Sequence, residues 1–217
     1  MESITPNTQD TERKMTSPKA SNITEDDVRN AIRTVLLYIG EDPEREGLQN
    51  TPDRILRMFD EIFRGYKPEK KPRITTFRNS SHSTEMVFDC GDYYSMCEHH
   101  ILPFFGKYYF AYIPSAEGRI LGISKVARVV GYCAARLQLQ ERLAREIIDM
   151  LSEALGGTAE GFAIVMQGKH MCKSMRGVRN KGEMCVSYFS GCFEKNRQLR
   201  NEFYNLVNLA ANNNRQQ

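Results

Sequence analysis

Two short segments rich in cysteine and histidine constrain the fold of this chain more than any other feature. In the first, Cys97 is followed three positions later by His100, with His99 between them. In the second, His170 precedes Cys172 by two positions. Thiolate sulfur and imidazole nitrogen are ligand atoms that zinc prefers in proteins. If both segments hold one ion, the fold must bring the first into contact with a segment far along the chain.

The spacing of these residues leaves two kinds of zinc site open. A structural site takes four protein ligands, which Cys97, His100, Cys172 and one more histidine would supply. A catalytic site takes three protein ligands and leaves one position to water, whose pKa zinc lowers to about 7. In that second case His99 and His170, each beside a ligand, are placed to move protons.

The composition is that of an ordinary globular protein. The chain has 217 residues, 41% of them hydrophobic, and a net charge of +3, so charge gives no reason to expect a nucleic-acid partner. No run of about 18 apolar residues predicts a membrane span, and the polar N-terminus does not resemble a secretory signal. We therefore expect a cytoplasmic protein without membrane association, whose six cysteines stay reduced.

The N-terminal part of the chain is predicted to be a tail followed by helices. Residues 1–22 are polar and predicted to be disordered, and the last residues, 212–217, are expected to fray. Residues 23–72 are predicted to be a helical region. A capping box at Thr24 begins one helix, and a Thr-Pro pair at residues 51–52 begins another.

Residues 73–211 are predicted to form one α+β unit. The strand pattern is clearest at residues 107–113, where large aromatic residues alternate with smaller ones, as in a half-buried strand. One-sided apolar stripes predict helices that begin near Ser124 and Leu139, and a further helix is predicted at residues 194–209. The first cysteine–histidine segment falls between two strands, on a connection of the kind that often carries a site.

Polar residues at the start of two predicted helices suit a nucleotide. Ser124 is placed to cap the first, and Lys125 and Arg128 add positive charge where a helix N-terminus already favours an anion such as phosphate. At the start of the next helix, the Glu141 carboxylate can accept from two parallel donors of a guanine edge, with Gln140 beside it. Both groups have a simpler interpretation, because cations can face solvent and a carboxylate stabilises a helix N-terminus.

Four motifs resemble the GTP cyclohydrolase I family, in that family's order and at closely similar separations. They are Ser-Met-Cys-Glu-His-His at 95–100, Gly-Ile-Ser-Lys-Val-Ala-Arg at 122–128, Gln-Leu-Gln-Glu-Arg-Leu at 138–143, and His-Met-Cys at 170–172 with Arg176-Gly177. The segment Thr51–Arg54 also resembles the family, so the similarity covers about residues 24–207.

The resemblance implies a zinc-dependent enzyme of folate and pterin biosynthesis. Such an enzyme opens the imidazole ring of the guanine in GTP by hydrolysis, releases formate and yields 7,8-dihydroneopterin triphosphate after rearrangement. By matching position, Cys97, His100 and Cys172 are the implied zinc ligands. His170 is the implied proton donor to a ring nitrogen of the purine, and His99 the implied proton shuttle.

The matching positions also imply a substrate site. Glu141, backed by Gln140, resembles the guanine-recognition position of the family. A contact with the ribose is implied for Ser124, and contacts with the triphosphate are implied for Lys125, Arg128, Arg176 and, more loosely, Arg54 and Arg57. For the last two arginines, spacing alone favours a solvated basic face of the second helix.

The family's tunnelling fold predicts the architecture. It is an antiparallel sheet with two long helices on one face, and the sheets of many subunits close into a barrel, usually a homodecamer with active sites at subunit interfaces. The chain departs from the family at residues 182–189, Gly-Glu-Met-Cys-Val-Ser-Tyr-Phe, where the family often has a Thr/Ser-rich strand. This departure includes none of the implied zinc ligands and neither of the implied catalytic histidines. For residues 182–189, however, the resemblance does not predict the contacts with the phosphates or the contacts between subunits in the barrel.

Overall fold

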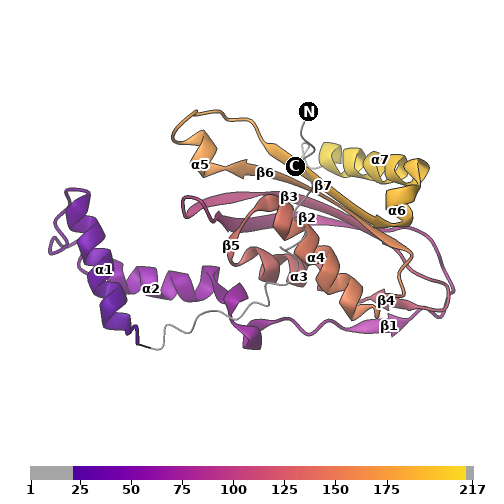
Figure 1. Ribbon diagram of the computed structural model, residues 1–217, viewed down its shortest axis with the longest axis horizontal. Coiled ribbons are helices and arrows are strands. Elements are labelled where there is room, and N and C mark those ends of the chain that lie inside the picture. Colours follow the sequence, from indigo (N-terminus) through magenta and orange to yellow (C-terminus); the bar gives the residue numbers. More distant parts are fainter. Residues whose placement is uncertain (1–21, 214–217) are drawn as a thin grey trace, which may run out of the picture. The chain divides into compact units, whose positions relative to one another are not determined.

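The computed structural model describes residues 22–213, and these fall into two compact units (Figure 1). One unit ends at Met58 and the other begins at Phe59. The predicted disordered tail lies outside the described residues except for its last residue, as do the last four residues of the predicted frayed end. Among the helices of the described part, none is long and apolar enough to cross a membrane.

The first unit contains helix α1 (Glu25–Tyr38) and most of helix α2 (Thr51–Ile62). The predicted helix start at Thr24 is confirmed, because its side chain caps α1 within a complete capping box. Arg29 joins the two helices, since its Nε donates to Asp53 Oδ1 at 2.8 Å. This hydrogen bond lowers the pKa of the Asp53 carboxyl, so the pair is charged at neutral pH.

The second unit is built on a five-stranded sheet whose order is β5-β2-β3-β6-β7. Neighbouring strands run antiparallel, as predicted, except that the short β5 runs parallel to β2. A separate antiparallel pair is formed by β1 and β4. The strands are β1 (Thr76–Arg78), β2 (Val87–Cys97), β3 (Leu102–Ile113), β4 (Arg119–Leu121), β5 (Leu137–Gln138), β6 (Gly161–His170) and β7 (Met184–Gly191).

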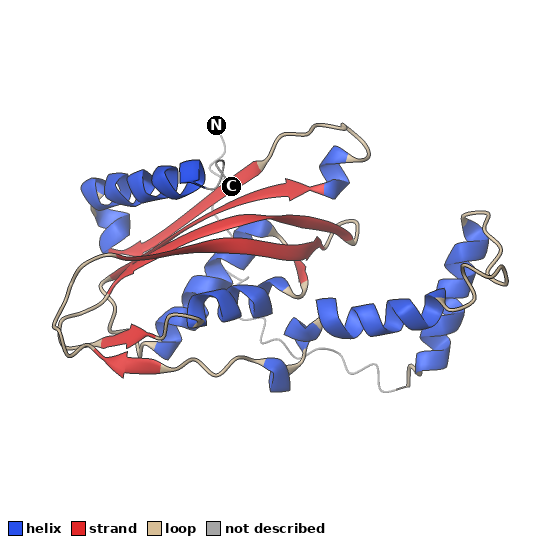
Figure 2. Cartoon of the chain, turned by 180° about the vertical axis from the view of Figure 1, so that it is seen from behind, coloured by secondary structure: helices blue, strands red, loops and turns tan. Residues whose placement is uncertain are grey.

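Helices cover both faces of the sheet (Figure 2). As predicted, two long helices, α3 and α4, pack on one face; α7 packs on the other. The bounds of the helices are α3 (Lys125–Ala134), α4 (Gln140–Ala154), α5 (Met171–Ser174), α6 (Cys192–Lys195) and α7 (Arg197–Asn213), with the short 3₁₀ turns η1 (Arg64–Tyr66) and η2 (Pro68–Lys70). The predicted α+β architecture with N-terminal helices is therefore confirmed.

The second half of the aromatic strand β3, residues 108–113, is buried on both faces. Tyr108 and Phe110 lie in the core under α3 and α4, whereas Tyr109 and Ala111 lie in a second core with Phe203 of α7. The prediction of a half-buried strand is wrong, because α7 covers the face that the alternating pattern assigns to solvent. A strand that is covered on both sides is a rigid base for the residues at its ends.

The predicted C-terminal helix is interrupted at Asn196. The backbone of Asn196 is extended, and its side-chain oxygen accepts from the amides of Gln198 at 2.9 Å and Leu199 at 3.3 Å. This asparagine caps the start of α7, since it satisfies amides that have no partner within the helix. The single helix predicted at residues 194–209 is thus two helices, and the second extends to Asn213.

Strand pairing places both cysteine–histidine segments at one end of the sheet. Cys97, the last residue of β2, lies opposite Leu102, the first residue of β3. Two positions further along β3, Phe104 lies opposite His170, the last residue of β6. Cys172 follows in the first turn of α5. The register of β3 with its two neighbours therefore brings residues far apart in the sequence to one place.

Candidate metal centre and active site

Cys97, His170 and Cys172 form a group that can hold a metal ion. One ligand atom from each residue lies within 4.8 Å of the others, and the two sulfur atoms are 3.7 Å apart. Two sulfur atoms at about 2.3 Å from one zinc ion, in tetrahedral geometry, are about 3.8 Å from each other. The types of donor and the separation of the sulfurs therefore fit zinc.

The raised pKa of the Cys172 thiol makes metal binding at this pair dependent on pH. Burial raises the pKa of the Cys172 thiol, and the hydrogen bond and charge of Cys97 raise it further. A bound metal ion reverses this tendency, because it coordinates the thiolate form and drives the proton off. Metal binding at this pair must therefore release protons, and the affinity of the site for zinc falls as the pH falls.

The His170 side chain is held on two sides. Its ring stacks on the ring of Phe104, with centroids 4.4 Å apart and planes 6° from parallel. Its Nε2 lies 2.9 Å from Oε1 of Gln140. Burial lowers the pKa of His170, the charge of Lys173 adds to this effect, and the charge of Glu141 opposes it. The imidazole is therefore neutral at pH 7, as a group that accepts protons must be.

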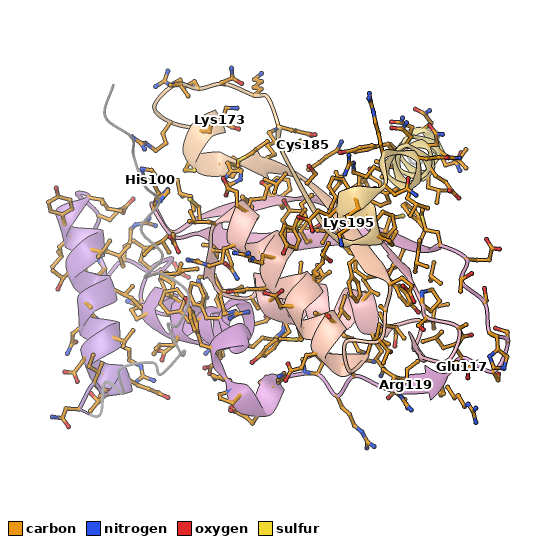
Figure 3. All side chains as sticks on the ribbon, turned by 45° about the vertical axis from the view of Figure 1, so that its right-hand side comes forward. His100, Glu117, Arg119, Lys173, Cys185 and Lys195 are labelled. Carbon is orange, nitrogen blue, oxygen red and sulfur yellow. The ribbon has the colours of Figure 1, made fainter. Side chains whose placement is uncertain are left out.

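His100 lies outside this group and contacts a cation instead. Its side chain is exposed, and its Nε2 lies 2.8 Å from Nη1 of Arg176. A guanidinium can only donate, so Nε2 accepts and the ring proton is on Nδ1. His99 is also exposed, and its ring is perpendicular to that of His100, with centroids 6.4 Å apart. Figure 3 shows His100 at the same end of the sheet as Lys173 on α5.

An ion-pair network that the sequence analysis missed supports the first cysteine–histidine segment. The Glu98 carboxylate pairs with Arg142 of α4. Arg142 also donates to Gln138 Oε1 at 2.9 Å and to the Leu137 carbonyl at 3.0 Å. Helix α4 and strand β5 thereby hold Glu98 in place, and Glu98 lies between the candidate ligand Cys97 and the two histidines. The opposite charges were visible in the sequence, but the pairing depends on tertiary structure.

The two residues at the start of α4 have different environments. Gln140 is fully buried, and its amide group donates to the carbonyls of Met166 at 2.8 Å and Met184 at 3.1 Å. Glu141 is exposed, yet close enough to His170 for its charge to act on the histidine pKa. The exposed carboxylate is therefore free to bind a ligand beside the candidate metal centre.

The predicted anion site at the start of α3 is accessible. Ser124 occupies the N-cap position, but its hydroxyl makes no capping hydrogen bond. Lys125 is half-buried and Arg128 is exposed in the first turn. Ser124 therefore stands at the predicted N-cap position without making the capping hydrogen bond. Its hydroxyl and the two cations can face a ligand.

This anion site and the metal centre lie at opposite ends of β2 in one chain. Gly122 and Ile123 line a cavity of about 160 Å³ together with Phe88 and Asp89, near the start of the strand. Cys97 is its last residue. At about 3.3 Å per residue, the eight steps from position 89 to position 97 span about 26 Å. The start of α3 therefore lies toward the end of β2 that is far from the cysteines.

The remaining predicted phosphate contacts divide between the two units. Arg176 lies at the metal centre, beside His100. Arg54 and Arg57 are exposed on α2 within the first unit. Their predicted side-by-side placement on one helix follows from their spacing of three residues.

The chain is similar to known proteins over most of its length. The family model described as GTP cyclohydrolase I matches residues 28–208. Three proteins named GTP cyclohydrolase 1 are among the relatives. One from Caldanaerobacter subterraneus subsp. tengcongensis is 44% identical over 86% of this chain and 98% of its own length. One from Clostridium perfringens is 43% identical over 86% of this chain and 100% of its own length. One from Dehalococcoides mccartyi is 40% identical over 83% of this chain and 95% of its own length.

Replacing Cys172 with serine is expected to remove zinc from the purified protein. The change deletes one of two sulfur ligands 3.7 Å apart, and an alcohol is a far weaker ligand than a thiolate. Metal analysis of the native chain should give one zinc per chain, and of Cys172→Ser close to none. Cys185→Ser, which changes an exposed cysteine outside the group, should keep its zinc. Full zinc content in Cys172→Ser would contradict the assignment.

Proposed function

The chain belongs to the GTP cyclohydrolase I family, and from this premise we propose the reaction that it catalyses and the residues that carry it. It is an enzyme that adds water to the imidazole ring of the guanine in GTP, releases formate and forms 7,8-dihydroneopterin triphosphate. The observation that carries this proposal is the convergence of Cys97, Cys172 and His170 beside the exposed carboxylate of Glu141. These residues combine a zinc site with a group that can recognise guanine.

Cys97, Cys172 and His100 are the proposed zinc ligands. His100 lies in a turn that is closed by a hydrogen bond of 2.9 Å from the Ile101 amide to the Cys97 carbonyl, so its backbone is held in the same turn as the first sulfur ligand. Its lone pair is on Nε2, and binding zinc through this atom requires that it leave Arg176. The arginine is then released to contact phosphate. When bound, zinc supplies the Lewis acidity that lowers the pKa of water to about 7.

His170 and His99 are the proposed proton carriers. His170 is neutral at pH 7 and accepts a proton from the water that enters the reaction, then donates it to a ring nitrogen of the purine. His99 is exposed next to His100 and exchanges protons with solvent. The separation of roles places one histidine on the metal, one on the substrate and one at the solvent boundary.

Glu141 is the proposed guanine anchor. The N1–H and the 2-amino group of guanine form two parallel donors that one carboxylate can accept. Its position in the first turn of α4 suits an anionic side chain, because the helix N-terminus favours negative charge. Its proximity to His170 places the guanine ring within reach of the proton carrier.

A second copy of the chain is proposed to complete each site. Ser124, for the ribose, and Lys125 and Arg128, for the triphosphate, lie at the start of α3, which begins beside residues near the start of β2, whereas the metal centre lies at the end of β2. Strand β7 lies at one edge of the sheet, and β2 pairs with β5 only at Met96 and Cys97. Within residues 22–213 these strand edges have no further pairing partner and can continue the sheet into a neighbour, which supports a closed barrel of subunits, proposed as a homodecamer. Arg54 and Arg57 are proposed as further phosphate contacts.

Incubation of the zinc-loaded protein with GTP is expected to release formate in a one-to-one ratio with a pterin product. Oxidation and dephosphorylation of that product should give fluorescent neopterin. ATP, which lacks the 2-amino group and N1–H of guanine, should give neither. A zinc-replete preparation that releases no formate from GTP would exclude the proposed reaction.

Two histidine variants are expected to separate metal binding from proton transfer. His100→Ala should lose both zinc and formate release, because it removes a ligand. His170→Ala should keep its zinc and lose formate release by about 10²- to 10⁴-fold, the range for a group that acts as general acid or base. Zinc content by metal analysis and formate release are measured on the same samples. Loss of zinc from His170→Ala, with zinc retained in His100→Ala, would exchange the two assignments.

Mixed oligomers are expected to show that sites are shared between chains. Cys172→Ser and the double variant Lys125→Ala/Arg128→Ala should each be inactive alone. When the two are co-expressed and assemble at random, about one quarter of the sites combine an intact metal half with an intact phosphate half, so activity should return to about that level. Arg176→Ala, on the same half as the metal, should give no recovery with Cys172→Ser. Recovery by neither pair would place the whole site in one chain.

A further inference from the structure

The Gln140 side chain is a polar group in an unusual place for a substrate contact. It is the first residue of α4, it is fully buried, and its amide points into the sheet. The amide nitrogen donates to the Met166 carbonyl of β6 at 2.8 Å and to the Met184 carbonyl of β7 at 3.1 Å. Both of its N–H groups are therefore bound to the backbone of neighbouring strands.

These two hydrogen bonds fix which way the amide points. If the group were turned over, its oxygen would face two carbonyl oxygens and its nitrogen would lose both acceptors. In the observed orientation Oε1 faces Nε2 of His170 at 2.9 Å. A carbonyl oxygen only accepts, so His170 Nε2 must carry the proton that it donates. In the neutral ring the other nitrogen, Nδ1, then holds the lone pair.

The packing around the amide leaves it no alternative position. An added Cβ at Gly168 would lie 2.6 Å from Gln140 Oε1 and 2.4 Å from the Tyr93 hydroxyl, closer than real Cβ contacts allow. The amide therefore occupies space that exists because residue 168 is glycine. On the histidine side, the stacked ring of Phe104 prevents the imidazole from tilting away from its partner.

We propose that Gln140 is a positioning residue, which holds His170 with its proton on Nε2 so that Nδ1 alone exchanges protons with the substrate. The inference rests on the proposed function and refines it, because the resemblance assigns Gln140 to the substrate. Glu141, exposed beside it, then recognises guanine alone. The side chain of Gln140 acts through His170 and touches no reacting atom.

The arrangement suits a histidine that must gain and lose a proton without moving. When Nδ1 accepts a proton from the water that enters the hydrolysis, the Nε2–H bond to Gln140 persists. When Nδ1 gives this proton to a ring nitrogen of the purine, the ring returns to the same tautomer. Neither step requires the imidazole to turn over, and the hydrogen bond of an orienting partner is retained throughout.

Steady-state kinetics of Gln140→Met test the role of the side chain. Methionine has a similar length, but its sulfur is only a weak acceptor for Nε2–H and it cannot donate to the two backbone carbonyls. We expect kcat for GTP to fall about 10- to 100-fold, the usual loss when an orienting partner of a histidine is removed, with KM changed by less than about 2-fold. The matched control, Glu141→Gln, should raise KM. A raised KM with unchanged kcat in Gln140→Met would make Gln140 a substrate contact, and unchanged values of both would exclude any role.

Nitrogen NMR of the zinc-loaded, ¹⁵N-histidine-labelled protein tests the tautomer without any turnover. The His170 signals, assigned by their loss in His170→Ala, should show Nε2 protonated in the native chain. Gly168→Ala replaces no reacting group, but its Cβ would clash with the Gln140 amide and the Tyr93 hydroxyl, so we expect it to displace the amide and give a mixture of tautomers and a lower kcat. Protonation at Nδ1 in the native chain, or an unmixed Nε2–H tautomer in Gly168→Ala with native kcat, would overturn the inference. Absence of formate release by the native chain would instead overturn the proposed function alone.

Discussion

The pairing of β3 with β2 on one side and β6 on the other is the constraint on which the site depends. The first residue of β3 lies opposite Cys97, and Phe104, two positions later, lies opposite His170. Side chains alternate between the faces of a strand, so a shift of one residue would move His170 to the opposite face of the sheet. The register is protected against such a shift, because residues 108–113 of β3 are buried on both faces and contribute to two hydrophobic cores.

The site is then tightened by polar contacts that connect the sheet to α4. Arg142 holds Glu98 in the turn after β2, and Gln140 holds His170 at the end of β6. Both partners lie in the first turn of one helix, so the two cysteine–histidine segments are positioned by the same rigid element. A helix anchored by its apolar face on the sheet can orient side chains at its N-terminus more accurately than a loop can.

The sequence predicts the parts of this arrangement that depend on residue type and local pattern. The helix start at Thr24 and the one-sided stripes of α3 and α4 are confirmed, because caps and helical periodicity are local properties. The convergence of Cys97 with Cys172 could be anticipated from ligand chemistry, since zinc gives distant thiols a reason to meet. The second face of β3 was predicted wrongly, because the helix that covers it is contributed by the far end of the chain.

The role of Gln140 belongs to the part that sequence alone does not reveal, and it bears on the departure from the family that the sequence resemblance predicts at residues 182–189. Strand β7 begins within this segment, at Met184. The contact that Gln140 makes there uses the Met184 carbonyl, and its other contact uses the carbonyl of Met166. Backbone carbonyls are the same in every residue type, so the side chains of this strand can change while the amide orientation, and with it the tautomer of His170, is preserved. A site held through the backbone constrains the path of the strand and leaves its sequence free to vary.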